Sequence, residues 1–483
     1  MESQPPADVT TPDMPTQGAP IPDFLQLQQV PVNYIQQLET DLLEPVVFSQ
    51  GGVTTDGFCR FTLQNKGFLH SHSKIFLSVQ PKGTNEDVYF PPHLGVAQLI
   101  KKAVFKIGNK TLNELDSWAG LHAVKSSLIS NENNLEREMY MTGRAMANKF
   151  SYNASSIVQA DSISLDTGFE NDEGAGALYL PDALTMNGVD DAGKKECPVF
   201  MIDLSDLFPF LKVHQLPLYM MKEAINIELT FQPTTKFRCQ IASGDTADIE
   251  MEIDRNELKF CADYIFYGAT DEMERYAMAN KDLNFSFVDY RVIETTTSSG
   301  DLESGVIRNL GMANRLVPRV ITTFGRDKDT YNEETILGQY TSVSPFINAS
   351  GVQSGALKYN IRYNDRFEYT SDVDNTSRLF SILTDSEGVP FITRSAFSDQ
   401  ATSGKYSDTE LFEGRDQSTG IDGQQFYLSS RLSNGRVGQR GIELHISGSW
   451  PGSGATAPSV LRCYCEYMRV ARLVDGMVEI YNA

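Results

Sequence analysis

At 483 residues the chain is too long to fold around one hydrophobic core, so two large domains are expected. Acidic residues outnumber Lys and Arg by 63 to 41, and no basic residue precedes Arg60, which excludes a basic arm for packing nucleic acid. No stretch of about 20 apolar residues occurs, which excludes a typical membrane-spanning helix.

Residues 1–35 are rich in Pro, Thr, Gln and Asp, and contain neither a basic leader nor an apolar run. Such a composition buries too little apolar surface to fold, so we expect a flexible N-terminal arm and no secretory signal. The six cysteines lack the spacings of zinc ribbons and thioredoxin motifs. Together these features indicate reduced thiols in a protein made inside the cell and not secreted through a signal peptide.

Alternation of apolar and polar residues dominates wherever the chain shows a clear pattern. It predicts antiparallel strands with one buried and one solvent-facing side, as two packed sheets require. In chain order, the clearest segments are "CRFTL", "KIFLSVQ", "KKAVFKIGNK", "EAINIELTF", "LKYNIRYND" and "GIELHIS". The predicted fold class is therefore all-β.

Helical patterns are short. Residues 116–130 predict a helix that Asp116 could cap, and "LSDLFPFLK" predicts a single turn interrupted at Pro209. Residues 270–280, "TDEMERYAMAN", predict a helix whose acidic first turn suits the helix dipole. None is long enough to form a layer, so the helices are expected to be accessory.

Two long polar segments, residues 166–196 and 398–423, fall late in each half of the chain and suggest that one plan is used twice. The resulting prediction is two consecutive jelly-roll domains, each an eight-stranded antiparallel sandwich. The first covers residues 36–269, a connecting helix covers 270–280, and the second covers 281–483.

The closing segment contains Cys463 and Cys465. If residues 461–467 form a strand, the thiols lie about 7 Å apart on its apolar side, opposite Arg462, Tyr464 and Glu466. Zinc would require two further ligands, and a disulfide between the pair would be strained. We expect buried small hydrophobic residues, with a metal or redox site as the alternative.

Other candidate chemistry is sparse. His70 and His72 form an isolated "HSH", a weak metal pattern that fits a polar strand end, and His445 falls on the solvent side of its strand. Asp203 and Asp206 illustrate the carboxylate pair that a glycosidase would need, although Asp206 fits a turn better. The sequence contains no nucleophile elbow, Walker loop or dinucleotide fingerprint. No catalytic, cofactor-binding or metal-binding residue is assigned, and no cofactor or enzymatic activity is expected.

Several segments, in their order and spacing, resemble the double jelly-roll major capsid proteins of DNA viruses. The segment "ELKFCADYIFYGATDEMERYAMA" is similar to the last strand of that family's first barrel and the acidic helix after it. The segment "RCYCEYMRVARLVDGMVEIYNA" is similar to the family's terminal strand and final turn. Further similar segments are "QLIKKAVFKIGNKTLNELDS" and "VFMIDLSDLFPFLKVHQLPLYMMKEAINIELTF". The modest length and "LKYNIRYNDRFEY" most resemble the members from Polinton-like viruses and virophages.

This resemblance implies a structural subunit of the virion that forms homotrimers, or hexons, with a pseudo-hexagonal outline. Such capsomers tile the faces of an icosahedral capsid. The implied partners are copies of the chain, neighbouring capsomers, and minor capsid and penton proteins, without direct nucleic-acid binding. A jelly-roll carbohydrate-binding or carbohydrate-active protein is the alternative, because sandwich folds also host such functions.

Overall fold

The computed structural model describes residues 36–82, 88–89, 95–127, 141–142, 185–186, 189–190, 193–194, 199–212, 215–234, 240–241, 250–267, 282–325, 342, 356–387, 427–433, 435–449 and 458–482. The predicted arm at 1–35 and connecting helix at 270–280 lie outside these ranges, as does nearly all of the two long polar segments. Among the described helices, none combines the length and apolar character needed to cross a membrane.

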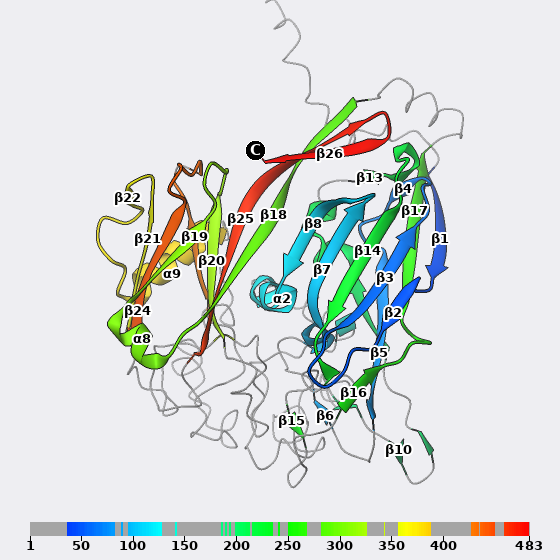
Figure 1. The fold of residues 1–483 in the computed structure, drawn as a ribbon, viewed down its shortest axis with the longest axis horizontal. Helices are drawn as coiled ribbons and strands as arrows, with labels where there is room; N and C mark the ends of the chain where they lie inside the picture. Colours follow the sequence, from blue (N-terminus) through cyan, green and yellow to red (C-terminus); the bar gives the residue numbers. More distant parts are fainter. Residues whose placement is uncertain are drawn as a thin grey trace, which may run out of the picture.

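The first half of the chain forms a sandwich of two antiparallel sheets (Figure 1). One sheet runs β12–β5–β17–β4–β13, with β1 on β17 and β16 on β5. Its strands are β1 (Gln36–Leu43), β4 (Phe68–Leu69), β5 (Lys74–Lys82), β12 (Val199–Asp203), β13 (Leu216–Pro217), β16 (Glu250–Ile253) and β17 (Lys259–Tyr267). The facing sheet runs β2–β3–β14–β7–β8, with β2 (Val47–Ser49), β3 (Gly57–Leu63), β7 (Ile100–Ile107), β8 (Lys110–Asp116) and β14 (Ile225–Phe231).

The second half forms another two-sheet sandwich beside the first (Figure 1). One sheet runs β18–β25–β20–β23, with β26 on β25, and the other runs β19–β24–β21–β22. The strands are β18 (Asp282–Thr296), β19 (Val306–Gly311), β20 (Arg319–Gly325), β21 (Ala356–Tyr363), β22 (Arg366–Phe367), β23 (Tyr427–Arg431), β24 (Ile442–Ser449), β25 (Val460–Val474) and β26 (Met477–Asn482). The predicted all-β class with two sandwich domains is therefore confirmed.

Short elements complete the structure. The helices are η1 (Gly95–Leu99), α2 (Trp118–Ser127), α6 (Leu204–Leu207), η3 (Pro209–Lys212), η4 (Leu218–Met220), α8 (Ser299–Ser304) and α9 (Thr376–Glu387). Small strands are β6 (Val88–Tyr89), β9 (Thr185–Met186) and β15 (Gln240–Ile241) in one sheet, and β10 (Val189–Asp190) with β11 (Gly193–Lys194) in another. The interruption at Pro209 is confirmed. Asp116 does not cap α2 as predicted, because it ends β8 and Ser117 turns the chain with a positive φ of 47°.

The two sandwiches repeat one strand plan in the same chain order. Comparison of the sheet orders pairs β1, β3, β5, β7, β8, β12, β14 and β17 with β18, β19, β20, β21, β22, β23, β24 and β25. Helix α2 follows β8 just as α9 follows β22. The prediction that one plan is used twice is thus confirmed by topology, even though the two halves show no visible sequence alignment.

Candidate functional site

Cys463 and Cys465 lie in the middle of β25, where both side chains are buried. Cys463 faces Thr322 on β20, whose hydroxyl lies 3.9 Å from the sulfur. Burial raises the pKa of the Cys463 thiol to about 12 and also raises the pKa of Cys465. The predicted burial of these two small side chains is confirmed.

The opposite side of β25 differs from the alternating pattern. Arg462, Tyr464 and Glu466 are also buried, at 5%, 0% and 8% exposure. The prediction of one buried and one solvent-facing side is wrong for β25, because the first sandwich covers the side that alternation assigns to solvent. The Tyr464 hydroxyl donates a 3.1 Å hydrogen bond to the carbonyl oxygen of Ser117, which lies between β8 and α2.

The other candidate side chains, His72, Asp203 and Asp206, have separate contacts in the structure. His72 Nδ1 lies 3.2 Å from Asp203, whereas the Asp206 carboxylate accepts a 2.8 Å hydrogen bond from Lys212. The two carboxylates therefore have different side-chain partners. Within the described part of the chain, no group of three or more His, Cys, Asp or Glu side chains is arranged to hold a metal ion.

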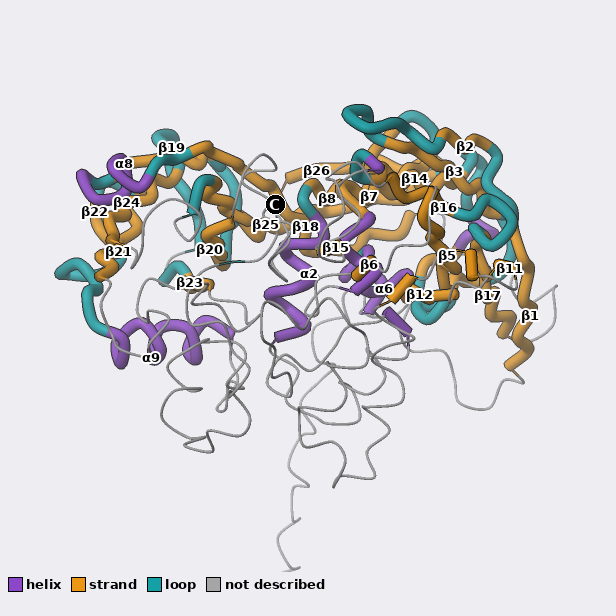
Figure 2. The backbone as a smooth tube through the Cα atoms, turned by 90° about the horizontal axis from the view of Figure 1, so that it is seen from below, coloured by secondary structure: helices purple, strands orange, loops and turns teal. Residues whose placement is uncertain are grey.

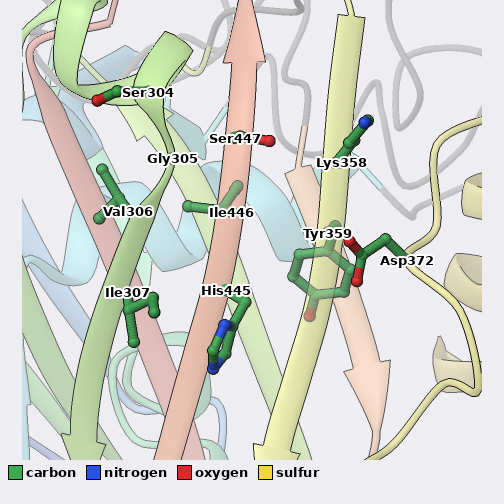
Figure 3. A pocket seen from close by; sticks show the side chains of 10 residues that line it. All are labelled: Ser304, Gly305, Val306, Ile307, Lys358, Tyr359, Asp372, His445, Ile446 and Ser447. Atoms are coloured by element: carbon green, nitrogen blue, oxygen red, sulfur yellow. The ribbon is translucent and has the colours of Figure 1, made fainter.

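A pocket of about 240 Å³ lies on the solvent side of the sheet that contains β19, β24 and β21 (Figure 3). Its lining includes the side chains of Ile307, Lys358, Asp372 and His445 (Figure 3). His445 is only 24% exposed, because its ring packs edge-on against Phe367 with centroids 5.0 Å apart. His445 thus lies on the solvent side of its strand, as predicted, and is partly covered there by Phe367. The Glu443 carboxylate lies 3.7 Å from Nε2 of His445. This arrangement fits a packed surface better than a general base that points into the pocket.

A cluster of buried, hydrogen-bonded polar side chains lies where the two sandwiches meet. Asp289 on β18 is 1% exposed and accepts hydrogen bonds from Tyr467 at 2.9 Å and Arg469 at 2.7 Å. From the first sandwich, the Asn113 side-chain amide on β8 donates to it at 2.9 Å. Burial raises the pKa of Asp289, and the opposing effect of the Arg469 guanidinium does not cancel that rise. Arg469 also donates to the Leu112 carbonyl of β8 at 3.0 Å, so the cluster ties the sandwiches together.

Further contacts extend this junction along β18. The Ser117 hydroxyl donates to Glu294, which also accepts a 2.9 Å hydrogen bond from Arg462. Burial raises the pKa of Glu294, but Arg462 and Ser117 together outweigh that effect and lower the net pKa. Lys125 on α2 lies over the Tyr290 ring at 4.4 Å and donates to its hydroxyl.

Apolar packing joins the same two surfaces. Phe210 of the first sandwich contacts Phe287 of β18, with ring centroids 5.6 Å apart. Most of the buried apolar residues of both sandwiches belong to one continuous hydrophobic cluster. We therefore describe the junction, formed by β8 and α2 on one side and β18 and β25 on the other, as a single rigid face.

The sequence patterns did not single out Asp289 and Arg469 as functional residues. The sequence does contain a pattern that indicates burial of Asp289. This residue follows Phe285 and Phe287 at the same two-residue spacing, so it falls among the apolar positions of the strand. A carboxylate in the apolar phase of a strand indicates burial with a partner, since an unpaired buried charge is very costly.

The ends of the molecule expose apolar side chains. Leu38 and Leu42 on β1 are 56% and 57% exposed, and Phe367 on β22 is 46% exposed. The β1 and β22 ends lie at opposite extremes of the long axis in both views (Figures 1 and 2). Exposed apolar residues grouped on a surface often mark contacts with another protein.

The sequence matches no family model and no curated protein. Three solved structures are similar in fold. A chain in the Sputnik virophage structure superposes with a TM-score of 0.58 at 10% identity, covering 99% of this chain and 93% of that one. The mavirus major capsid protein gives 0.51 at 10% identity, covering 99% and 97%. A chain of the PBCV-1 virus capsid gives 0.51 at 11% identity, covering 93% and 97%. The chain has the double jelly-roll fold.

The double jelly-roll resemblance that the sequence motifs predict is thus confirmed at the level of fold. The superpositions cover nearly all of both chains, so they include both sandwiches and their side-by-side arrangement. Hereafter each sandwich is called a barrel. Identities of 10–11% mean that the common feature is the strand plan and not a common set of side chains.

Proposed function

We propose that this protein is a major capsid protein, a structural subunit that trimerises into pseudo-hexagonal capsomers of an icosahedral virus shell. The observation that carries the proposal is the pair of barrels that share one eight-strand plan and are joined by one buried face. Three such chains in a ring present six similar barrels, and repetition of one interface is how a single chain builds a closed assembly.

The chemistry of the described residues supports a structural role. The two cysteines of β25 are buried with raised pKa values, and the most buried ionic cluster, around Asp289, joins the barrels instead of lining an opening. A subunit whose function lies in contact area needs no catalytic group. We accordingly propose no enzymatic activity and no cofactor.

The proposed location is the virion, and the proposed partners are copies of this chain, neighbouring capsomers, and minor capsid and penton proteins. The net charge of −22 disfavours direct binding to nucleic acid, since such binding gains its affinity from clustered cations. Two similar solved structures are described as a virus capsid and as a major capsid protein, which supports this choice over a carbohydrate-binding role.

Negative-stain electron microscopy of the purified full-length chain tests the proposal. We expect compact blocks with a pseudo-hexagonal outline and threefold symmetry. Single two-lobed particles at every concentration would contradict the proposal. Stoichiometric binding on a glycan array by such monomers would favour the carbohydrate alternative instead.

A further inference from the structure

The pocket on the second barrel can be compared with the same region of the first barrel, because the two barrels share one strand plan. Strands β19, β24 and β21 correspond to β3, β14 and β7. The last five residues of β21 and β7 have the same pattern of buried and half-buried positions, which aligns Lys358 with Lys102. On the neighbouring strand, Ser447 lies beside Lys358 just as Thr230 lies beside Lys102. Differences between the two regions therefore show which features are particular to the pocket.

The hollow arises where the second barrel lacks a large side chain. In the first barrel, Phe58 of β3 lies beside Thr230. In the second barrel, Val306 pairs with Ile446, so Gly305 faces Ser447 and takes the position of Phe58. A Cβ atom on Gly305 would meet, among the described residues, only the Cβ atom of Ser447, at 3.7 Å. The space that an aromatic ring occupies in the first barrel is thus open in the second.

The charges of the two regions also differ. Lys102 of the first barrel forms ion pairs with Glu114 and Asp116 of β8. The counterpart of β8 is β22, which consists of two residues, neither of them acidic. Lys358 is exposed and has no ion pair with any residue that the structure describes. An unpaired ammonium group beside a hollow favours a ligand with a negative charge.

Asp372 places a carboxylate in the lining of the same pocket. Its Oδ1 atom accepts a 3.1 Å hydrogen bond from the side-chain amide of Asn360 on β21. The next residue, Val373, exchanges two backbone hydrogen bonds with Tyr359, at 2.9 and 3.0 Å. These contacts hold the carboxylate in place without neutralising Lys358. Because a carboxylate accepts several hydrogen bonds, Asp372 retains capacity for hydroxyl groups of a ligand.

Ile307 gives the pocket an apolar wall. This side chain is 61% exposed and lies beside His445 in the sheet (Figure 3). The corresponding residue of the first barrel is the charged Arg60. The pocket volume of about 240 Å³ is below the roughly 300–1,000 Å³ of sites for drug-sized ligands, so it suits a single small chemical unit.

We propose that this pocket binds the acidic sugar at the end of a glycan. Lys358 pairs with the sugar carboxylate, Asp372 accepts hydrogen bonds from ring hydroxyls, and Ile307 contacts the C–H face of the ring. A hexuronic acid combines these three features in one small unit. A phosphate group lacks the apolar face and is repelled by Asp372, an acidic peptide side chain lacks the hydroxyls, and a neutral sugar leaves Lys358 unpaired.

The proposed interaction is reversible binding, in which no covalent bond forms or breaks. It goes beyond the proposed function, because it assigns a ligand to the surface of a single chain and does not require trimers. In an assembled shell, many copies of one weak site would act together on a surface that carries many glycans.

The test uses ligand-observed NMR with the full-length protein and two probes, methyl β-D-glucuronide and methyl β-D-glucoside. These sugars differ only in a carboxylate that replaces a hydroxymethyl group. We expect a dissociation constant on the order of 1 mM for the glucuronide, as for other small ligands held by few groups. The glucoside should bind about 10-fold more weakly or less, because it lacks the charged hydrogen bond to Lys358.

Three variants locate the binding. K358Q should reduce the affinity for the glucuronide to that for the glucoside. S447F should abolish binding of both sugars, because the ring fills the hollow, and phenylalanine is well tolerated in strands. The matched control is K102Q in the first barrel, which removes the corresponding ammonium group and should leave binding unchanged. Circular dichroism verifies that each variant remains folded.

Four results would overturn the inference. These are no binding of the glucuronide at about 10 mM, ten times the expected constant; equal binding of the two sugars; equal weakening by K102Q and K358Q; and displacement of the glucuronide by an equal concentration of inorganic phosphate, which would indicate a site for any anion.

Sedimentation velocity on the same samples separates this inference from the proposed function. A trimer that does not bind the glucuronide would overturn the pocket ligand and leave the proposed function standing. A monomer that binds the glucuronide through Lys358 would overturn the proposed function and support the pocket ligand.

Discussion

Asp289 is the residue on which the junction between the barrels converges, since Asn113, Tyr467 and Arg469 all donate to it. Its folded-state pKa is raised, chiefly by burial, so the folded protein binds a proton at this group more readily than the unfolded chain does. Stability from this group therefore increases as the pH falls from the raised folded value towards about 4.

The variant D289N tests the direction of this pH dependence. It keeps the shape of the side chain and removes the titration, so the wild-type protein should gain stability relative to D289N as the pH falls across that window. Chemical denaturation of both proteins at several pH values between about 7 and 4 measures the difference. A stability difference that is constant with pH, or that changes in the opposite direction, would show that Asp289 does not titrate as described.

Thiol reactivity gives a second test at the residue scale. Burial raises the pKa values of Cys261, Cys463 and Cys465, but Cys261 on β17 is only partly buried, whereas the other two are buried. In a chain with Cys197 and Cys239 replaced by Ser, iodoacetamide should label Cys261 first and should leave the β25 pair unmodified until the protein unfolds. Peptide mass spectrometry locates the label. Early labelling of Cys463 or Cys465 under native conditions would contradict their burial.

Individual residues also show how far the sequence could predict the structure. Period-two alternation correctly identified the core positions of β3, β14 and β24, whose burial alternates residue by residue. It failed for Arg462, Tyr464 and Glu466, because alternation describes one sandwich and gives no information on a second barrel that covers the outer side. The exposure of the two ends of the molecule could not be predicted from the sequence either, because Leu38 and Phe367 are apolar residues that alternation alone would place in a core.

At the scale of elements, the hairpin between β25 and β26 extends from the second barrel and attaches to the first. Asp475 and Gly476 form its turn, and the Gly476 carbonyl accepts a 2.9 Å hydrogen bond from the Lys222 backbone N–H. Gly476 has a φ of +83°, and a Cβ atom there would lie 2.9 Å from the Met220 carbonyl oxygen and 2.7 Å from the Lys222 side chain. The turn thus needs glycine both for its conformation and for its contact with the first barrel.

The variants G476A and G311A separate these two effects. Gly311 also has a positive φ, +67°, but a Cβ atom there would meet nothing within 4 Å. We expect G311A to lower the free energy of unfolding by about 1–2 kcal/mol through backbone strain alone. G476A should lower the free energy of unfolding by measurably more, because backbone strain and displacement of the hairpin both contribute to the loss. Equal losses in thermal or chemical denaturation would mean that the turn does not press against the first barrel.

Element boundaries show why sequence patterns alone were insufficient. The interruption at Pro209 was predictable from the missing N–H and the fixed φ of proline. The start of α2 was not, because β8 continues to Asp116 through pairing with Lys102 of β7, a contact made by residues distant from the helix pattern. The matching of β8 with β22 was likewise invisible in the sequence, since corresponding strands of the two barrels have different residues and lengths.

At the scale of the whole molecule, the continuous hydrophobic cluster makes the two barrels one rigid block. Hydrogen bonds across the junction, from Asn113 to Asp289 and from Ser117 to Glu294, hold the barrels in their relative position, since polar groups in a buried interface are stable only when each finds its partner. A block formed by two tightly packed barrels is suited to repeated assembly, because little conformational freedom is lost when copies associate. This property connects the residue-level contacts of Asp289 with the proposed capsid role.

The most direct test of the central claim is the mass of the wild-type chain in solution, measured by analytical ultracentrifugation over a wide range of concentrations. The account predicts a stable trimer that persists on dilution, with interfaces larger than about 2,000 Å², as long-lived homo-oligomers require. A protein that remains monomeric at the highest concentration would contradict it.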